Sequence, residues 1–482
     1  MGAEMANLIG GTWRLSNSRS LFETRDPATG EVLAQYGVST AADVDDAVDA
    51  ALKAFPSWRR EPAPARGKLL HRIADEVEAV KADLARTMTR EMGKVHSESI
   101  GEIDATIASC RFMAGEGLRA LGQVLPSSST NRTIMTVREP VGVVACITPW
   151  NFPIALAAYK VFAALISGNC VVWKPSPNIS GSARLFTEAL VKAGTPAGVV
   201  NLLSGGGIEA GRQLSTHPGV DAVAFTGSTA VGIEIAEACA RSLTPVSLEL
   251  GGKNAIIVLE DADLAQAANG IMQSAFATSG QRCTAASRLI VQRSVREPLL
   301  AELLRRCDQM QLGHGLDPAV NLGPLATSAQ LDRVASLVTD AVHAGAEILC
   351  GGARVRVAEY PKGSFYPPTL LGGIKETDTI ARTEVFGPVV AVIDVDDYEQ
   401  AVVANNNTDY GLSSAIYTRS LHFAHRAASD LASGVVYVNS GTSAAESGVP
   451  FGGMRLSGNG HREVSTHAFD VMTELKSVYM SF

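Results

Sequence analysis

The sequence predicts an α/β protein built on a doubly wound parallel sheet, and two observations carry this prediction. Between residues 141 and 251, short apolar runs alternate with single helical segments, and a second series of the same kind runs from 255 to about 450. Strands of about five to seven residues joined by single helices favour parallel pairing through right-handed crossovers. We therefore expect a Rossmann-like parallel-sheet domain followed by a second α/β domain.

The first series alternates regularly between the two kinds of element. Its expected strands are 141–147, 169–173, 199–203, 222–225 and 246–250, and its expected helices are 153–166, 181–193, 207–214 and 229–241. Upstream, residues 41–58 predict a helix with Thr40 as its N-cap and Asp43 three residues on. A longer helical stretch is predicted where Leu69, Ile73, Val77, Val80 and Leu84 share one stripe.

Two segments fall outside both series. Residues 122–140 and 465–482 are extended-looking mixtures of polar and apolar residues. We expect these two segments to pair as a small sheet.

Composition excludes several classes of protein. The chain has 482 residues, of which 46% are hydrophobic and 19% charged, so it has enough apolar material for two or three globular domains. The net charge of −8 and the lack of Lys/Arg runs argue against a nucleic-acid partner. The longest apolar stretches, such as 141–148, are too short to span a membrane.

The cysteines and the N-terminus indicate a cytoplasmic protein. Seven cysteines are scattered without a CxxC pair, and no HExxH motif is present, which fits a reducing compartment and argues against structural zinc. The first residues lack the basic stretch and apolar core of a signal peptide, and Ala6 breaks the myristoylation pattern.

A glycine-containing turn follows one expected strand. In Phe225-Thr-Gly-Ser-Thr-Ala-Val-Gly232 the free N–H groups of a helix N-terminus would face an anion, with Gly227 allowing the turn. The spacing is G-x-x-x-x-G, so alone it is a weak dinucleotide signal, and an ordinary strand–helix turn is the alternative. Lys174, in Trp173-Lys-Pro-Ser176, could donate to ribose hydroxyls or to a phosphate, or could be a solvated loop lysine.

Cys283 differs from the other cysteines in its surroundings. It lies in the polar sequence Ser279-Gly-Gln-Arg-Cys-Thr284, whereas Cys146 and Cys170 lie in apolar runs. A thiolate attacks carbonyl carbon readily, so Cys283 is a candidate nucleophile.

Three polar residues occupy turns or strand ends in apolar surroundings. Glu249 ends a strand that should be buried, where a carboxylate must be paired or raised in pKa. Asn151 lies in the turn Pro149-Trp-Asn-Phe-Pro153, where its amide could stabilise an oxyanion. Glu384 lies in Glu384-Val-Phe-Gly-Pro388. A capped strand end, a turn amide and a loop acid are the alternatives.

The motifs, taken together in their order, resemble the aldehyde dehydrogenase superfamily. The set is PWNFP, WKPS, FTGS, LELGGKN, GQRCT, EVFGPV and PFGG, and the resemblance extends from Ile9-Gly-Gly-Thr-Trp13 to the C-terminal tail. It implies an NAD(P)-binding domain formed by 1–121 and 141–251, and a catalytic domain over 252–450. It also implies that 122–140 and 465–482 build a homodimer or homotetramer.

The resemblance implies roles for matching residues only. Cys283 would be the nucleophile, Asn151 and the Cys283 N–H the oxyanion hole, and Glu249 the base that activates water to hydrolyse a thioester. Arg282 and Phe152 would contact the aldehyde. The residues expected to bind NAD or NADP are Trp150, Lys174, Ser176, Pro177, Gly227, Ser228, Gly251, Glu384 and Phe386.

Two residues depart from the commonest family pattern. Pro177 stands where NAD-preferring members often carry a Glu that repels a 2′-phosphate, so we expect dual or NADP-leaning specificity. Arg282 stands directly before the nucleophile and could hold a substrate carboxylate, lower the Cys283 pKa, or form a salt bridge away from the site. The C-terminal sequence looks most like the α-ketoglutaric semialdehyde dehydrogenase branch, with succinate-semialdehyde dehydrogenases next. A neutral aliphatic or aromatic aldehyde is the alternative substrate.

Other functions fit the sequence less well. CoA-acylating relatives generally lack the LELGG acid, and Glu249 is present. A non-catalytic lens-type relative would have lost the nucleophile or the base. The nine histidines form no ligand-spaced cluster, and a G-x-S-x-G elbow is absent.

Overall fold

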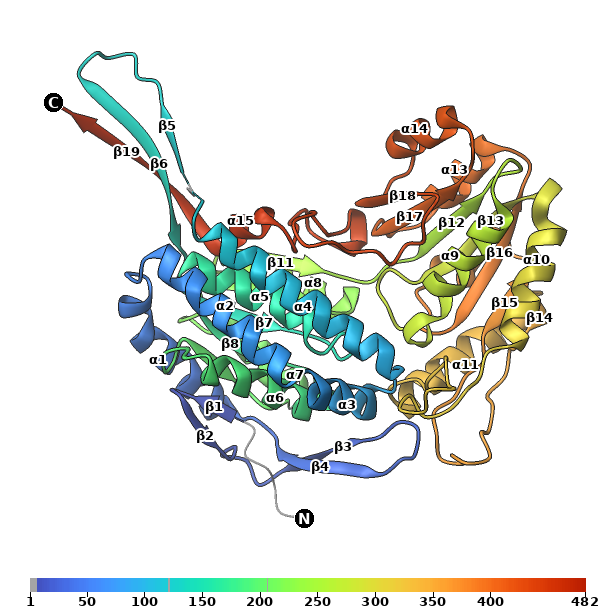
Figure 1. The fold of residues 1–482 in the computed structure, drawn as a ribbon, viewed down its shortest axis with the longest axis horizontal. Coiled ribbons are helices and arrows are strands. Elements are labelled where there is room, and N and C mark those ends of the chain that lie inside the picture. Colours follow the sequence, from blue (N-terminus) through green and yellow to red (C-terminus); the bar gives the residue numbers. More distant parts are fainter. Residues whose placement is uncertain (1–6, 120–121, 206) are drawn as a thin grey trace.

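Two seven-stranded sheets and one smaller sheet organise the chain (Figure 1). The structure is a computed structural model that describes residues 7–119, 122–205 and 207–482. The expectation that the N-terminus carries no signal sequence falls partly on residues 1–6, which lie outside the described residues. The α/β class is confirmed, and both large sheets are mainly parallel, each with antiparallel pairing at one edge.

The first sheet contains the strands expected between 141 and 250. Its order is β11-β10-β7-β8-β9-β1-β2. Five of its strands are buried along their whole length, which is typical of a sheet covered on both faces. The two antiparallel edge strands were not predicted. The bounds are β11 (Val246–Glu249), β10 (Ala222–Thr226), β7 (Val143–Ile147), β8 (Cys170–Lys174), β9 (Val200–Leu202), β1 (Asn7–Ile9) and β2 (Thr12–Arg14).

Eight helices accompany this sheet among the described residues. Thr40 caps the first of them, and Asp43 completes the capping box, as predicted. The expected long helix through Leu84 is wrong, because Val80 interrupts it and two helices result. The bounds are α1 (Ala41–Trp58), α2 (Ala63–Ala79), α3 (Lys81–Met92), α4 (His96–Glu116), α5 (Ala155–Ser167), α6 (Ser180–Lys192), α7 (Gly207–Thr216) and α8 (Thr229–Ala240).

The second sheet has the order β14-β15-β16-β13-β12-β17-β18. Alternate residues of β12 enter two separate core clusters, Ile257 in one and Ile256 in the other, so this sheet is packed on both faces. The strands are β14 (Glu347–Cys350), β15 (Thr369–Gly372), β16 (Val389–Val395), β13 (Ala286–Gln292), β12 (Asn254–Val258), β17 (Ser413–Tyr417) and β18 (Val435–Val438). The helices are α9 (Leu264–Phe276), α10 (Arg293–Asp308), α11 (Ser328–His343), α12 (Thr379–Arg382), α13 (Tyr398–Asn406) and α14 (Leu421–Asp430).

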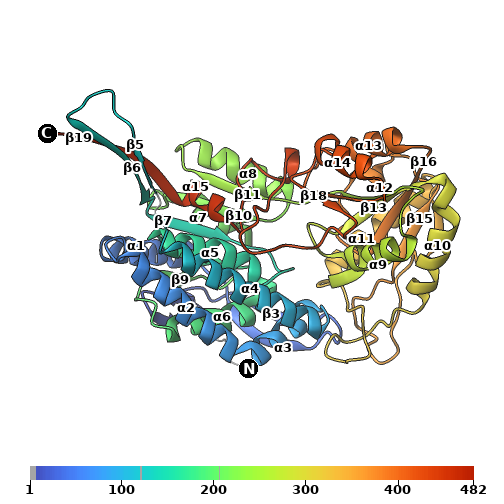
Figure 2. The ribbon, with the colours of Figure 1, turned by 45° about the horizontal axis from the view of Figure 1, so that its top comes forward.

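The two extended segments pair as predicted. β19 (Thr473–Ser481) runs antiparallel to β6 (Arg132–Pro140), which also pairs with β5 (Gly122–Leu125). These three strands form an arm that projects from the body, and the two ribbon views agree on its position (Figures 1 and 2). The short helix α15 (Phe469–Met472) joins the arm to the body, and a separate hairpin consists of β3 (Leu21–Arg25) and β4 (Val32–Gly37).

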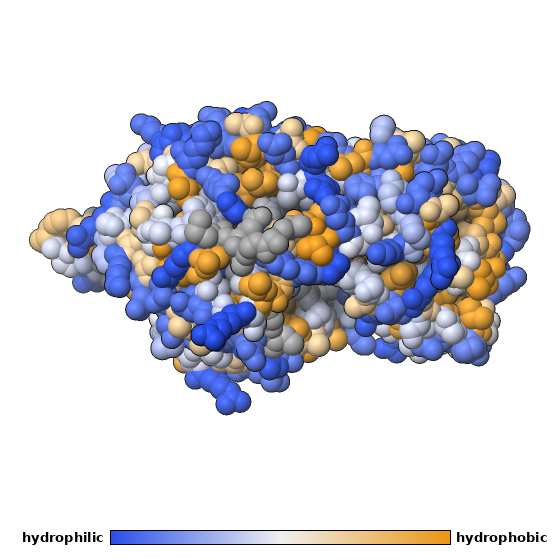
Figure 3. Space-filling model, turned by 90° about the horizontal axis from the view of Figure 1, so that it is seen from below, coloured by the Kyte–Doolittle hydropathy of each residue, from blue (hydrophilic) through white to orange (hydrophobic). Residues whose placement is uncertain are grey.

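The surface is mainly hydrophilic on the face drawn in Figure 3, with hydrophobic residues in small groups. Within the described ranges, no helix has the length and apolar character needed to cross a membrane.

Candidate active site

Two adjoining cavities lie at the carboxyl ends of strands in the first sheet. The larger has a volume of about 780 Å³ and the smaller about 510 Å³. They share Pro149, Thr226, Gly227 and Ser228, so they form one continuous depression. Ligands of open α/β sheets bind at this edge.

The larger cavity is lined by three residues that were predicted to bind the cofactor, namely Lys174, Ser176 and Pro177. Lys174 is buried at the end of β8, and its ammonium donates to the Pro175 carbonyl at 3.1 Å. Burial lowers the pKa of Lys174 to about 8. Sequence reasoning missed Arg212, which also lines this cavity.

The turn between β10 and α8 faces both cavities. Gly227 and Ser228 line each of them, and Ser228 is the N-cap residue of α8. The Ser228 side chain makes no capping hydrogen bond, so its hydroxyl and the helix N–H groups are available to an anionic ligand.

The smaller cavity collects the other predicted cofactor residues around Cys283. Trp150 and Phe386 meet edge to face with ring centroids 5.6 Å apart. Glu384 accepts a hydrogen bond from the Gly252 N–H at 3.0 Å, and burial raises its pKa to about 7. A Cβ at Gly251 would lie 2.2 Å from Glu384 Oε2, so any larger residue there would displace the Glu384 carboxylate. The lining members among the predicted residues are Trp150, Asn151, Gly227, Ser228, Gly251, Cys283, Glu384 and Phe386.

Cys283 follows a strained segment. Thr278 and Ser279 both have φ of +54°, in the left-handed region that disfavours residues with a Cβ. Asn254 Nδ2 holds the backbone at and after Cys283, because it donates to the Cys283 carbonyl at 2.7 Å and to the Ala285 carbonyl at 3.0 Å.

The environment of Cys283 raises its pKa rather than lowering it. Burial contributes most, followed by the carboxylates of Glu384 and Glu249, and the pKa rises to about 12. The alternative in which Arg282 lowers this pKa is therefore not supported.

Glu249 ends β11 and lines neither cavity. It is 4% exposed, and neither carboxylate oxygen has a hydrogen-bond partner among the described residues. Burial and Glu463 raise its pKa well above the usual value, while Lys160 and Arg462 act in the opposite direction. A buried, unpartnered carboxylate is costly for stability, and this is typical of a functional acid or base.

Asn151 lies on the wall of the smaller cavity at the entrance to α5. It is 3% exposed, and its Nδ2 donates to the Gln281 carbonyl at 3.0 Å. The second Nδ2 hydrogen remains available for an oxyanion.

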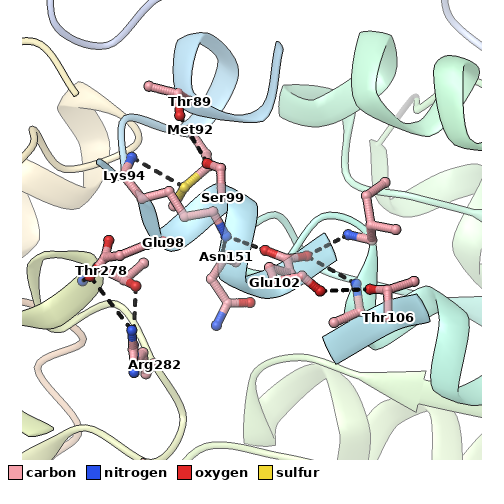
Figure 4. A network of polar contacts seen from close by, with 12 residues as sticks. Thr89, Met92, Lys94, Glu98, Ser99, Glu102, Thr106, Asn151, Thr278 and Arg282 are labelled. Atoms are coloured by element: carbon pink, nitrogen blue, oxygen red, sulfur yellow. Dashed lines mark hydrogen bonds and ion pairs between the residues drawn. The ribbon is translucent and has the colours of Figure 1, made fainter. Parts of the chain in front are cut away.

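Arg282 and Phe152 line neither of the two cavities. Arg282 Nε donates to Thr278 Oγ1 at 3.0 Å, and its Nη2 lies 3.6 Å from Glu98 Oε1 (Figure 4). The Phe152 ring has the Arg282 guanidinium 5.5 Å from its centroid and the Lys94 ammonium 4.6 Å from it. Arg282 was expected to bind substrate, to lower the Cys283 pKa or to form a salt bridge, and the structure shows a salt bridge with Glu98.

Sequence reasoning missed a buried ion pair beside Glu249. Lys160 Nζ, on α5, donates to Thr226 Oγ1 at 2.7 Å and to Glu463 Oε1 at 2.5 Å. A lysine within the apolar helix ALAAYKVFAALIS was the signal, because a buried ammonium needs a partner. Glu463 gave no comparable local signal.

No group of three or more potential metal-ligating side chains occurs in the described part of the chain. A thiol and an amide donor on the cavity wall, with a buried carboxylate nearby, at the edge of a doubly wound sheet are what a dinucleotide-dependent oxidoreductase with a cysteine nucleophile needs.

Comparisons with known proteins identify the family. The model of the aldehyde dehydrogenase family matches residues 13–478. The chain is 38% identical to the α-ketoglutaric semialdehyde dehydrogenase of Bacillus subtilis, over 98% of this chain and 97% of that protein. It is 35% identical to the NADP-dependent succinate-semialdehyde dehydrogenase of Escherichia coli, over 97% and 96%. The structure of Staphylococcus aureus betaine aldehyde dehydrogenase with NAD+ has a TM-score of 0.97 at 32% identity, over 100% and 98%.

The chain belongs to the aldehyde dehydrogenase family, and it is an NAD(P)-dependent aldehyde dehydrogenase.

Proposed function

We propose that this enzyme oxidises an aldehyde bearing a terminal carboxylate to the corresponding dicarboxylic acid, through a thiohemiacetal and a thioester on Cys283. The hydrolytic route rests on the observation that Glu249 is a buried carboxylate with no hydrogen-bond partner in the described part of the chain. Its charge also contributes to the raised pKa of Cys283. The relatives named for α-ketoglutaric and succinic semialdehydes support the substrate class.

In the first stage the Cys283 thiol loses its proton to solvent water, and the thiolate sulfur forms a bond with the aldehyde carbon. The carbonyl oxygen becomes an oxyanion, which the Asn151 amide and the Cys283 N–H stabilise. A nicotinamide cofactor, when bound, would supply the acceptor for the hydride that leaves this carbon, and the oxidation would leave a thioester on Cys283.

The second stage hydrolyses the thioester. Glu249 removes a proton from water, hydroxide adds to the thioester carbon, and the carbon–sulfur bond breaks. The products are the carboxylic acid and the Cys283 thiolate, which takes up the proton from Glu249 and so restores both groups for another turnover.

The residues of the two cavities fit NAD or NADP. Lys174 and Ser176 would hold the adenosine ribose or a phosphate on it, and the α8 N-terminus with Ser228 would hold the pyrophosphate. Glu384 would hold the nicotinamide ribose, with Trp150 and Phe386 packed nearby. Pro177 lines the same cavity as Lys174. A proline has no negative charge that would repel a 2′-phosphate, so we expect NADP to be used.

The division into domains and the assembly are part of the same proposal. We assign cofactor binding to 1–121 and 141–251, catalysis to 252–450, and assembly into a homodimer or homotetramer to 122–140 and 465–482. The exposed, nine-residue edge strand β19 supports the assembly role, because an open edge invites pairing with another chain.

A matched pair of substrates tests the substrate class. A short aldehyde ending in a carboxylate is compared with its methyl ester, using both cofactors, in the wild type and in Arg282→Gln. If Arg282 binds the carboxylate, the wild type prefers the acid by about tenfold or more in kcat/KM, since charge-assisted hydrogen bonds contribute roughly 1.5–3 kcal/mol. Arg282→Gln then removes this preference. Equal kcat/KM values for the two substrates contradict the proposal.

A further inference from the structure

Charged residues at the start of α4 contact two parts of the active site, the turn that carries Asn151 and the segment that leads to Cys283. Lys94 lies just before α4, and Glu98 and Glu102 lie one turn apart on the same face of it. The side chains of Lys94 and Glu102 are fully buried, and they form an ion pair (Figure 4). These three residues, which we call the α4 clamp, have no role in the mechanism above.

Glu102 and Lys94 hold the turn that carries Asn151. Glu102 Oε1 accepts hydrogen bonds from the N–H groups of Ile154 at 2.8 Å and Ala155 at 2.9 Å. Ile154 is the N-cap of α5 and has no side-chain acceptor, so Glu102 supplies the cap from another helix. Lys94 Nζ donates to the Asn151 carbonyl at 3.3 Å.

Glu98 holds the segment that leads to Cys283. Its Oε1 accepts a hydrogen bond from the Thr278 N–H at 2.7 Å and faces Arg282 at 3.6 Å. Thr278 is one of the residues with positive φ, so Glu98 stabilises a backbone conformation that is unfavourable by itself.

The Asn151 turn and the Cys283 segment also contact each other directly, because Asn151 Nδ2 donates to the carbonyl of Gln281, two residues before Cys283. The amide and the thiol come from segments 132 residues apart in the chain (283 − 151). One rigid helix therefore fixes both segments, and the distance between amide and sulfur depends on it.

We propose that the α4 clamp consists of positioning residues, which set the oxyanion-binding amide of Asn151 against the sulfur of Cys283. The inference rests on the proposed roles of Asn151 and Cys283. The clamp acts on the addition to a carbonyl, where the oxyanion develops, and it does not act on the intrinsic reactivity of the thiol.

The test compares two reactions of the same thiol. Glu102→Ala, Glu98→Ala and the charge-balanced double variant Lys94→Met/Glu102→Gln are assayed for the burst of NAD(P)H with aldehyde, and for alkylation of Cys283 by iodoacetamide. The proposal expects the burst rate to fall about tenfold or more, since small misplacements of catalytic groups have effects of this size, while alkylation changes less than about twofold. Asp104→Asn is the matched control, because Asp104 is an exposed α4 carboxylate that pairs with Lys81. A parallel loss of both reactions, or no loss of the burst, overturns the proposal.

Asn151→Ala separates failure of the clamp from failure of the catalytic assignment. If the clamp acts through Asn151, adding Glu102→Ala to Asn151→Ala lowers the burst rate less than about twofold further. If Asn151→Ala is impaired and the two effects multiply, the clamp proposal alone is wrong. If Asn151→Ala has full activity, the role of Asn151 in the proposed mechanism is wrong, and the clamp has nothing to position.

Discussion

Lys160 Nζ lies 2.5 Å from Glu463 Oε1, and this ion pair joins α5 to the C-terminal part of the chain. Both side chains are nearly inaccessible to solvent, and both act on the Glu249 carboxylate. Lys160 lowers the Glu249 pKa and Glu463 raises it, so the protonation of the proposed base depends on residues outside the two cavities.

Glu249→Gln should separate the two stages of the reaction. The variant keeps the burst of NAD(P)H, because acylation of Cys283 uses the Asn151 side of the site. Steady-state turnover should fall by about 10²- to 10⁴-fold, the usual effect of losing a general base. Glu297→Gln, a change at an exposed residue of α10, is the control. Loss of the burst together with turnover contradicts the assignment.

The pH dependence of turnover should report the Glu249 environment. Glu249 acts as a base only when ionised, and its pKa is raised, so the rising limb of kcat lies well above pH 4.5. Lys160→Met removes a cation that lowers this pKa and should move the limb to higher pH, by about one unit. A limb that stays in place or moves to lower pH in Lys160→Met would falsify this coupling.

Pro177→Glu should shift cofactor preference toward NAD. The new carboxylate stands beside Lys174 on the larger cavity, where it repels a 2′-phosphate, and kcat/KM for NADP should fall about tenfold or more relative to NAD. Pro177→Gln controls for shape. Asn178→Glu adds the same charge one residue further, outside the lining of this cavity. A wild-type preference for NAD above about a hundredfold, or about 2.7 kcal/mol, would remove the basis of this prediction.

NADP binding should weaken in alkaline solution. The pKa of Lys174 is lowered to about 8, so its ammonium is charged below pH 8 and loses its proton above it. KM for NADP should therefore rise between pH 7 and pH 9 by about tenfold, while KM for NAD changes less. Lys174→Arg keeps its charge over this range and should flatten the profile. Identical profiles for the two cofactors in the wild type speak against a phosphate contact.

Charges on the arm should break the proposed assembly. Leu475 and Tyr479 lie on the same face of β19 and are 62% and 63% exposed. The double variant Leu475→Lys/Tyr479→Lys should lower the molar mass measured by light scattering, because the lysines prevent apolar contact between arms. Leu421→Lys adds a lysine at an exposed residue of α14 and should leave the mass unchanged. An unchanged mass for the double variant places the interface elsewhere.

The sequence predicted the elements with strong local patterns. The buried strands β7, β8 and β10 are continuous apolar runs, and Thr40 with Asp43 forms a local capping box, so neighbouring residues contain the information. The break at Val80 was missed because the apolar stripe continues across it, and the stripe alone does not reveal the end of a helix.

The long-range charge pairs could not be predicted in this way. Glu463 pairs with Lys160 across 303 residues, and Glu98 contacts the Thr278 N–H across 180. No spacing rule connects such residues, because the contact depends on the packing of whole elements. The raised pKa of Cys283 was missed for the same reason, since it follows from burial and from carboxylates in other segments.

The pairing of Lys160 with Glu463 has a consequence for the order in which the protein matures. During synthesis, the first sheet and α5 leave the ribosome long before residue 463, so the Lys160 ammonium has no carboxylate partner until the second sheet has been translated. Asn169 likewise waits for the Met472 carbonyl, also 303 residues later. A nascent chain therefore acquires the electrostatic environment of Glu249 only at a late step of synthesis.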